Sequence, residues 1–139
     1  MFWDTSALVR CYDPGEPDHG RARSFLLAER VHEASAFIVP ELTSTVVRKL
    51  GRDRRNRDAL LKTIKGHLAF FDLSAVAEGH LEEATRLIKT YSLRAADALH
   101  VASALILRKE LGRRSLAFLT ADREQAQAAR SERLKVFEL

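Results

Sequence analysis

The fold class is decided by residues 115–122, Ser-Leu-Ala-Phe-Leu-Thr-Ala-Asp. Residues 115–120 predict a strand, because an unbroken apolar run is typical of a parallel strand that is buried on both faces of its sheet. Asp122 follows this strand and is predicted to begin the last helix, since Asp is favoured at helix N-termini. A buried strand that leads directly into a helix indicates an α/β protein.

Strands and helices alternate through the rest of the chain. Further strands are expected at residues 1–4, 35–39, 70–73 and 134–138. Helices are expected at residues 6–12, 18–30, 40–50, 56–69 and 94–111, with one more after Ser74, which is predicted to cap it. Helix 94–111 is apolar on more than one face, so we expect one side to meet the sheet and another a second subunit. The alternation predicts a parallel sheet.

The length and composition indicate one globular domain. The chain has 139 residues, of which 46% are apolar and 30% charged, and this favours a single domain, residues 1–139, with a hydrophobic core. No run of eighteen apolar residues and no leader segment is present, so we expect a cytoplasmic protein with no membrane partner. Cys11 is the only cysteine, which excludes an internal disulfide and a cysteine-based metal site.

The basic residues are concentrated in one segment. The net charge is +4, from 23 basic and 19 acidic residues, which permits an anionic partner such as nucleic acid without requiring one. The segment contains Arg48, Lys49, Arg52, Arg54, Arg55 and Arg57. Two interpretations remain open: a solvated corner between two helices, or a surface that contacts phosphates.

Three aspartates lie where a predicted strand ends or a predicted helix begins. They are Asp4, Asp97 and Asp122. In a parallel α/β sheet these positions share one edge, and carboxylates gathered there repel one another unless a hard cation such as Mg²⁺ or Mn²⁺ lies between them. Each has a structural alternative: Asp4 is a good helix N-cap, Asp97 suits a helix dipole, and Asp122 forms a capping box with Gln125. Their coincidence favours a metal site.

Three polar residues near the aspartates are candidates for supporting roles. Ser6 is placed to hydrogen-bond a ligating carboxylate or a metal-bound water, and Thr120 to position a metal-bound water; both also suit helix termini. His100 follows Asp97 by three residues, on a similar face of the same helix. A general base and a packed helix residue are both open for it.

Three segments together resemble the signature blocks of PIN-domain proteins, and VapC-type toxins in particular. These are Asp4-Thr5-Ser6-Ala7-Leu8-Val9, residues 94–102 from Arg94 to Ala102, and Phe118-Leu119-Thr120-Ala121-Asp122. The resemblance covers essentially the whole chain. It implies a three-layer α/β/α fold with a central parallel sheet and a Mg²⁺- or Mn²⁺-dependent ribonuclease with Asp4, Asp97 and Asp122 as metal ligands. It also implies a homodimer and a cognate VapB-like antitoxin.

The chain departs from this family at one position. PIN domains normally carry a fourth acid, a Glu in the helix after the second strand, and the apolar pattern places that position near Thr45 or Val46. Glu41 is the nearest carboxylate, four residues before Thr45 and on the same helix face. It is either the displaced fourth catalytic acid or a first-turn Glu that the helix dipole favours. If the acid is missing, a slow nuclease or a PIN scaffold that only binds is expected.

The implied reaction is in-line hydrolysis of an RNA phosphodiester by a metal-bound water. Arg48, Arg52 and Arg55 are the candidates for holding the RNA backbone without reading its sequence. A phosphoacceptor receiver domain is the competing α/β class. It would need paired acids after the first strand and a lysine after the last one, whereas Asp4 stands alone and Asp122 is preceded by Thr120-Ala121.

Overall fold

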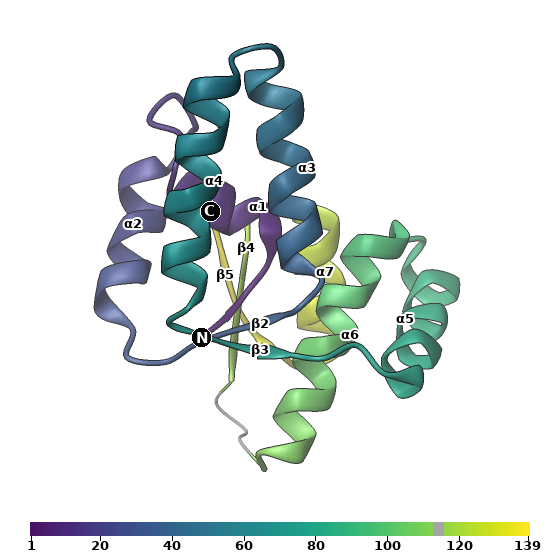
Figure 1. The fold of residues 1–139 in the computed structure, drawn as a ribbon. Coiled ribbons are helices and arrows are strands. Elements are labelled where there is room, and N and C mark those ends of the chain that lie inside the picture. Colours follow the sequence, from purple (N-terminus) through teal and green to yellow (C-terminus); the bar gives the residue numbers. More distant parts are fainter. Residues whose placement is uncertain (113–115) are drawn as a thin grey trace.

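The molecule is built on a central sheet of parallel strands. The computed structural model describes residues 1–112 and 116–139, and their sheet has five strands in the order β3-β2-β1-β4-β5 (Figure 1). The strands are β1 (Phe2–Trp3), β2 (His32–Ser35), β3 (Phe71–Ser74), β4 (Ala117–Thr120) and β5 (Lys135–Glu138). All four pairings are parallel. The sheet therefore requires a crossover between each pair of strands.

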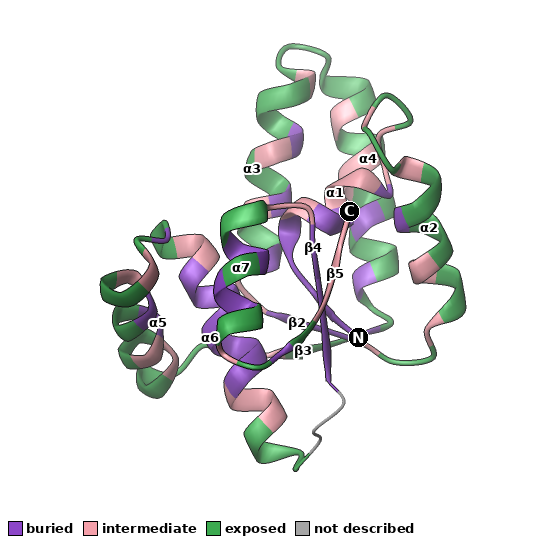
Figure 2. Cartoon of the chain, turned by 180° about the vertical axis from the view of Figure 1, so that it is seen from behind, coloured by how far each residue is buried: buried purple, intermediate pink, exposed green. Residues whose placement is uncertain are grey.

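Helices cover both faces of the sheet, so the expected three-layer α/β/α architecture is confirmed. One face carries α1 (Thr5–Arg10), α2 (His19–Ala28), α3 (Ile38–Leu50) and α4 (Arg54–Leu68). The other carries α5 (Glu78–Tyr91), α6 (Ala95–Glu110) and α7 (Arg123–Ser131). Buried residues line the sheet and the inward sides of these helices (Figure 2).

Two hydrophobic cores lie on the two faces. Successive residues of a strand point to opposite faces, and accordingly Trp3 packs with the α1–α4 core while Phe2 packs with the α5–α7 core. In the next strand of the sheet, Leu119 and Phe118 divide in the same way. All four side chains are fully buried. The middle of the sheet is thereby fixed between two apolar layers, and the loops at its carboxyl edge are held in place.

The second strand is not where its apolar residues predict it. Residues 35–39 were expected to form it, but β2 ends at Ser35 and Ile38 begins α3. The reason is the helical spacing of Ile38, Leu42 and Val46, which are all buried at intervals of four residues while Val39 is exposed. Pro40 lies in the first turn of this helix as expected.

The predictions for Ser74 and for the strand at residues 115–120 need correction or adjustment. Ser74 does not cap a helix: it ends β3, its hydroxyl donates to the carbonyl of Ala34 at 3.3 Å, and α5 begins only at Glu78. The strand expected at residues 115–120 begins at Ala117, and residue 115 lies outside the described residues.

Helix α6 is buried on more than one side, as its sequence predicts, but within the chain itself. One side contacts β2 and the others contact α5 and α7. A second subunit is therefore not needed to explain its apolar faces. None of the helices in the described residues combines the length and apolar character needed to cross a membrane.

Candidate active site

The predicted acidic residues line one cavity at the carboxyl edge of the sheet. Asp4 follows β1 and Asp122 follows β4. These two strands are neighbours in the sheet, and the order β3-β2-β1-β4-β5 reverses its direction between them. The first turns of α3 and α6 add Glu41 and Asp97. All four carboxylates line a cavity of about 340 Å³, together with Ser6. Such a switch point is where open α/β sheets bind ligands.

A larger depression elsewhere on the molecule is not lined by a group of acidic residues from the carboxyl edge of the sheet. It has a volume of about 970 Å³ and lies between α5, α6 and the end of α7. Its acidic residues Glu83 and Glu132 are both paired with Arg86, at 2.7 and 2.9 Å. The smaller cavity is therefore the better candidate for chemistry.

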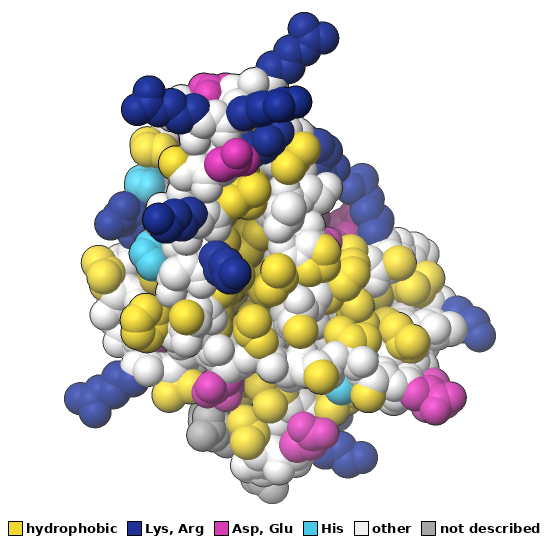
Figure 3. Space-filling view, viewed as in Figure 1, with side chains coloured by type: hydrophobic (Ala, Val, Ile, Leu, Met, Phe, Trp, Pro, Cys, Tyr) yellow, Lys and Arg dark blue, Asp and Glu magenta, His cyan; other side chains and the backbone are white. Residues whose placement is uncertain are grey.

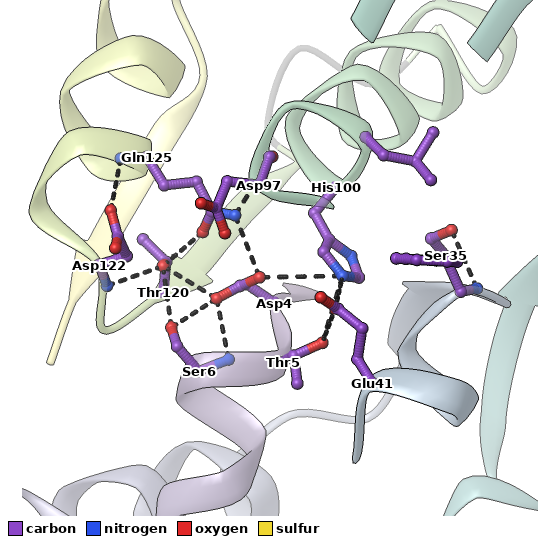
Figure 4. A network of polar contacts seen from close by, with 12 residues as sticks. Asp4, Thr5, Ser6, Ser35, Glu41, Asp97, His100, Thr120, Asp122 and Gln125 are labelled. Atoms are coloured by element: carbon purple, nitrogen blue, oxygen red, sulfur yellow. Dashed lines mark hydrogen bonds and ion pairs between the residues drawn. The ribbon is translucent and has the colours of Figure 1, made fainter. Parts of the chain in front are cut away.

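Asp4 is held by hydrogen bonds from α1, β4 and α7 (Figure 4). It is only 2% exposed. Its Oδ2 accepts from the backbone N–H of Ser6 at 2.9 Å and from the Ser6 hydroxyl at 2.5 Å, and it lies 3.1 Å from the Thr120 hydroxyl. Its Oδ1 accepts from Nε2 of Gln125 at 3.1 Å. The N-cap expected for Asp4 is present, and Ser6 contacts its carboxylate as expected. The contact of Thr120 with the same carboxylate was not predicted.

Gln125 is a site residue that the sequence analysis missed. Half of the expected capping box exists, since Asp122 accepts from the Gln125 backbone N–H at 2.8 Å. The Gln125 side chain does not return to Asp122. It is fully buried, its Nε2 donates to Asp4 and to the Asp97 carbonyl, and its Oε1 lies 2.6 Å from the Thr120 hydroxyl. The available signal was its place on the buried face of α7, beside Ala126 and Ala129.

Asp97 experiences the charge of the other acids. It is half-buried, and burial raises the pKa of its carboxyl to about 6, with further contributions from the charges of Asp4, Asp122 and Glu41. No hydrogen bond to the Asp97 carboxylate is present among the described residues. A positive charge in the cavity would favour the ionised form of Asp97.

Glu41 is bound by two residues at the back of the cavity. Its Oε2 lies 2.5 Å from the Thr5 hydroxyl and 2.5 Å from Nε2 of His100. Burial raises the pKa of Glu41, but hydrogen bonds from His100 and Thr5 outweigh it and lower the pKa below its usual value. Burial lowers the pKa of His100, but the hydrogen bond to Glu41 and the charge of Asp4 outweigh it and raise the pKa.

The position expected for the fourth acid and the nearest carboxylate, Glu41, both face the cavity. Thr45, where the apolar pattern of the sequence predicts it, does line the cavity. Val46, the other possible position, is buried in the core on the α1–α4 face. Glu41 reaches the same cavity from one helical turn earlier. The structure therefore brings together all four acids that the sequence analysis singled out.

Two basic residues contribute to the lining of the cavity. Arg10 and Lys49 line it, which the sequence analysis did not predict. Arg10 pairs with Asp18 at 3.1 Å, and Lys49 pairs with Asp13 at 3.0 Å and with Glu16. The charge of Arg48 lowers the pKa of Glu41 and thus acts on the cavity.

The basic run forms an exposed corner between two helices. Arg48 lies near the end of α3, Arg52 in the turn and Arg55 in the first turn of α4, and all three are exposed. Figure 3 shows Lys and Arg side chains projecting at this end of the molecule. The helix–helix corner is confirmed as a structural description, and contact with phosphates stays a prediction.

The chemistry of the donors suits a hard divalent cation. Carboxylate oxygens are the ligands that Mg²⁺ and Mn²⁺ prefer, and the pKa of Asp97 is raised by burial and, in addition, by the negative charges of its neighbours. Among the described residues, no three His, Cys, Asp or Glu side chains are already arranged so as to hold a metal ion. The residues fit the cation by donor type and by shared cavity, and Asp4, Asp97 and Asp122 would hold it.

Comparison with known proteins identifies relatives of this architecture. A family model described as the PIN domain matches residues 1–131. The fold resembles FitAcB from Neisseria gonorrhoeae, with a TM-score of 0.73 and 20% identity over 99% of this chain and 96% of that one. It resembles Mycobacterium tuberculosis VapC20, a Sarcin-Ricin loop cleaving toxin, with a TM-score of 0.70 and 19% identity over 91% and 93% of the two chains.

The fold also resembles that of a third solved structure. A chain of a toxin–antitoxin complex from Klebsiella pneumoniae has a TM-score of 0.59 and 21% identity, over 88% of this chain and 86% of that one. No curated protein matches the sequence significantly. At these identities the solved structures establish the likeness of the fold.

Proposed function

The chain belongs to the PIN-domain family, and from this premise we propose that residues 1–139 form a single-domain endoribonuclease that hydrolyses RNA with the help of Mg²⁺ or Mn²⁺. One observation carries the proposal. Carboxylates from four separate places in the chain line one cavity, and their mutual repulsion contributes to raising the pKa of Asp97 to about 6. A divalent cation would relieve this repulsion, and RNA phosphates are substrates that such a cation can activate.

Each acid has a distinct part in the proposed site. Asp4, Asp97 and Asp122 would hold the cation, and Glu41 would complete the acidic set. When bound, the cation supplies a water of lowered pKa and neutralises charge at the scissile phosphate. Asp4 arrives oriented, because Ser6 and Gln125 already donate to its two oxygens. Thr120 and Gln125 tie Asp4 to the start of α7, so the carboxyl ends of β1 and β4 act as one support.

The basic corner supplies the second half of the proposal. A polyanion cannot approach four carboxylates without compensating charge, and cations hold phosphates without reading sequence. Arg48, Arg52 and Arg55 are the proposed contacts to the RNA backbone. Arg48 is the best placed of them, because it shares a helix face with Thr45, which lines the cavity, and lies 3.4 Å from its hydroxyl.

We expect Arg48→Ala to weaken binding of single-stranded RNA about three- to tenfold at low salt. The reason is the loss of one phosphate contact, which should also reduce the slope of log K against log salt by about 0.7. Fluorescence anisotropy in an Asp97→Asn background, where RNA stays uncut, measures both quantities. Lys89→Ala, which removes another exposed cation, on α5, is the control. Equal weakening by both variants would mean that the basic corner is not the RNA surface.

We further propose that the protein is the toxin of a toxin–antitoxin pair, acts as a homodimer and is silenced by a VapB-like antitoxin. Support comes from the likeness of its fold to the Klebsiella toxin–antitoxin complex and to the VapC20 toxin. Copurification with the product of an adjacent small gene, followed by light scattering, tests the antitoxin and the dimer. Inhibition of cleavage by that product is the expected result.

The decisive test of the function is metal dependence. The purified protein is expected to cleave RNA with Mn²⁺ or Mg²⁺, to lose all cleavage in EDTA and to recover it when the metal is returned in excess. Calorimetric titration with Mn²⁺ in the absence of RNA should show binding, and bound metal should raise the melting temperature. Cleavage that persists in EDTA would contradict the proposal.

The same experiment separates the enzyme from a PIN fold that only binds. A binding protein would retain RNA with or without Mn²⁺ and produce no fragments. The sequence expectation that supports this second function is the absence of a carboxylate at Thr45 and Val46, where the apolar pattern places the fourth acid. A protein purified in the same way with Asp97→Asn controls for contaminating nucleases.

A further inference from the structure

Asp97 reaches the cavity from a helix that does not follow a strand. It lies in the first turn of α6, and α6 follows α5, so the carboxyl edge of the sheet does not place it. Burial raises the pKa of Asp97, and the charge of Asp4 is the largest of the neighbouring charges that raise it further. The separation between these two mutually repelling acids is therefore set by contacts outside the sheet.

Gln125 connects Asp97 to Asp4 through a single amide group (Figure 4). Its Nε2 donates to Oδ1 of Asp4 at 3.1 Å and to the backbone carbonyl of Asp97 at 3.2 Å. We call this pair of hydrogen bonds the Gln125 bridge. The backbone N–H of Gln125 also donates to Oδ1 of Asp122, at 2.8 Å. One residue of α7 thus contacts all three aspartates of the proposed metal site.

We propose that Gln125 is a positioning residue that fixes the separation of Asp4 and Asp97, so that the cavity favours Mg²⁺ over the larger Ca²⁺. This inference rests on the proposed nuclease function. It assigns Gln125 no contact with the substrate or with the cation. Gln125 acts through the Asp4 carboxylate and through the first turn of α6.

The orientation of the Gln125 amide follows from its partners. The Thr120 hydroxyl accepts from the backbone N–H of Asp122 at 3.0 Å and lies 2.6 Å from Oε1 of Gln125. Because Oε1 only accepts, the hydroxyl donates to it. Nε2 carries two hydrogens, and the Asp4 carboxylate and the Asp97 carbonyl accept one each. A flipped amide would place its oxygen against two acceptors, so only this orientation satisfies the group.

The Gln125 bridge is rigid because it is buried and anchored on the sheet. The Gln125 side chain is fully buried, and a buried polar network in which every member is satisfied stiffens its surroundings. Gln125 lies on the buried face of α7 with Ala126 and Ala129. Helix α7 packs on β4, β5 and α6. The bridge therefore fixes the first turn of α6 relative to the strand ends that carry the other acids.

A fixed separation of carboxylates affects cations differently. Mg²⁺ demands near-ideal octahedral geometry with short bonds to oxygen, whereas Ca²⁺ accepts longer bonds and flexible coordination. Selectivity between the two thus depends on the size and rigidity of the site. Without the Gln125 bridge, Asp4 and Asp97 are free to move apart under their mutual repulsion. That change should weaken the binding of Mg²⁺ more than the binding of Ca²⁺.

The experiment measures the cation affinities of metal-free Gln125→Met protein, with thermal unfolding recorded in EDTA. Methionine has nearly the length of glutamine but no hydrogen-bond donor. Calorimetric titration gives the affinity for Mn²⁺, and displacement of Mn²⁺ gives the affinities for Mg²⁺ and Ca²⁺. We expect the affinity for Mg²⁺ to fall about tenfold, the usual size for the loss of a group that supports a metal ligand. The affinity for Ca²⁺ should fall less, so the ratio of the two affinities should fall.

Two control variants lie on the same helix. Gln127→Met makes the same change at an exposed position of α7 and should leave all three affinities unchanged. Ala129→Gly destabilises α7, because glycine is a poor helix former, but removes no bond of the Gln125 bridge. If Gln125 served only stability, then Gln125→Met and Ala129→Gly would lower the melting temperature and leave the ratio of affinities for Mg²⁺ and Ca²⁺ as it is in the wild type.

The possible results separate the Gln125 bridge from the nuclease proposal. A larger loss for Mg²⁺ than for Ca²⁺ in Gln125→Met, absent from both controls, supports the bridge. Wild-type affinities in Gln125→Met, equal losses for the two cations, or the same losses in Ala129→Gly overturn it and leave the nuclease proposal standing. Absence of cation binding in the wild type overturns both.

A measurement on the wild type replaces the variant if Gln125→Met does not fold. The side-chain amide hydrogens of Gln125 are buried and bonded, whereas those of Gln127 are on an exposed residue of the same helix. Hydrogen exchange followed by NMR in the metal-free protein should therefore be far slower at the Gln125 amide. Equal exchange rates at the two amides would show that the bridge does not persist in solution and would overturn the proposal.

Discussion

Replacing Asp97 by Asn is expected to reduce metal-dependent RNA cleavage by more than about a hundredfold and, in the same protein, to increase stability without metal. The amide keeps the shape of the side chain but removes a charge that a cation needs. In the metal-free protein that charge is unfavourable, because Asp97 is half-buried beside Asp4, Asp122 and Glu41. One substitution should therefore separate function from stability.

The contribution of Asp97 to stability depends on pH, and the direction of that dependence follows from its pKa. The folded-state pKa of Asp97 is about 6, whereas an unfolded chain has a value of about 3.9. The folded protein thus binds the proton more tightly, and the contribution of Asp97 to stability is fully present below about pH 4 and is lost as the pH rises through 6. Above that pH, Asp97→Asn should be more stable than wild type by about 1 kcal/mol, after allowing for solvent screening of a half-exposed group.

Thermal denaturation in EDTA at about pH 4.5 and about pH 7.5, on either side of the folded-state pKa, measures the effect. At the higher pH the variant should melt roughly 3 °C above wild type, and at the lower pH the difference should shrink. Saturating Mn²⁺ should reverse the order, since metal stabilises only the protein that binds it. A variant that cleaves RNA at the wild-type rate would remove Asp97 from the site, and one that is less stable at both pH values would show that its charge is already compensated.

The sequence was sufficient to predict that Asp4 and Asp122 lie at one edge of the sheet, because those positions follow from local patterns. Asp97 opens α6, which follows α5 and not a strand, so the sheet alone does not place it. A strand that ends in an aspartate and a helix that begins with one can be recognised without knowing their neighbours. The parallel sheet then places all strand ends on one edge. The order of strands in the sheet was not needed for this prediction.

The sequence misled where two local patterns competed or where distant residues met. The apolar run ending at Val39 has the composition of a strand, but Ile38, Leu42 and Val46 form the buried side of α3, and that long-range packing decided the outcome. Gln125 reads as part of a capping box, yet its amide is taken by Asp4, which lies 121 residues away in the sequence. Glu41 and His100 meet across 59 residues. Patterns within a single sequence carry no information about contacts between residues that lie so far apart in the chain.

Asp4→Asn is expected to destabilise the protein by about 2 kcal/mol, opposite in sign to the same change at Asp97, because it leaves a buried donor unpaired. Each oxygen of the Asp4 carboxylate faces an N–H group that can only donate: the Ser6 backbone N–H on Oδ2, beside the Ser6 and Thr120 hydroxyls, and the Gln125 amide on Oδ1. An amide NH₂ must face one of these donors, and a buried donor left unpaired costs about 1–3 kcal/mol. Rotating the Gln125 amide would relieve the clash only by giving up its bond to the Asp97 carbonyl.

Asp53 is a helix cap without buried donors around it, so the same substitution there shows whether the loss at Asp4 comes from capping or from its buried hydrogen bonds. Asp4 caps α1 and Asp53 caps α4, and Asn is as good an N-cap as Asp. Asp53 is exposed, so Asp53→Asn should change the free energy of unfolding by less than about 0.5 kcal/mol. If Asp4→Asn is equally harmless in EDTA, then Asp4 is only a cap and its carboxylate is not prearranged by the strand ends. A large loss at Asp4 alone would mean that buried donors select a carboxylate at this position before any cation binds, which is the property that a preorganised metal site requires.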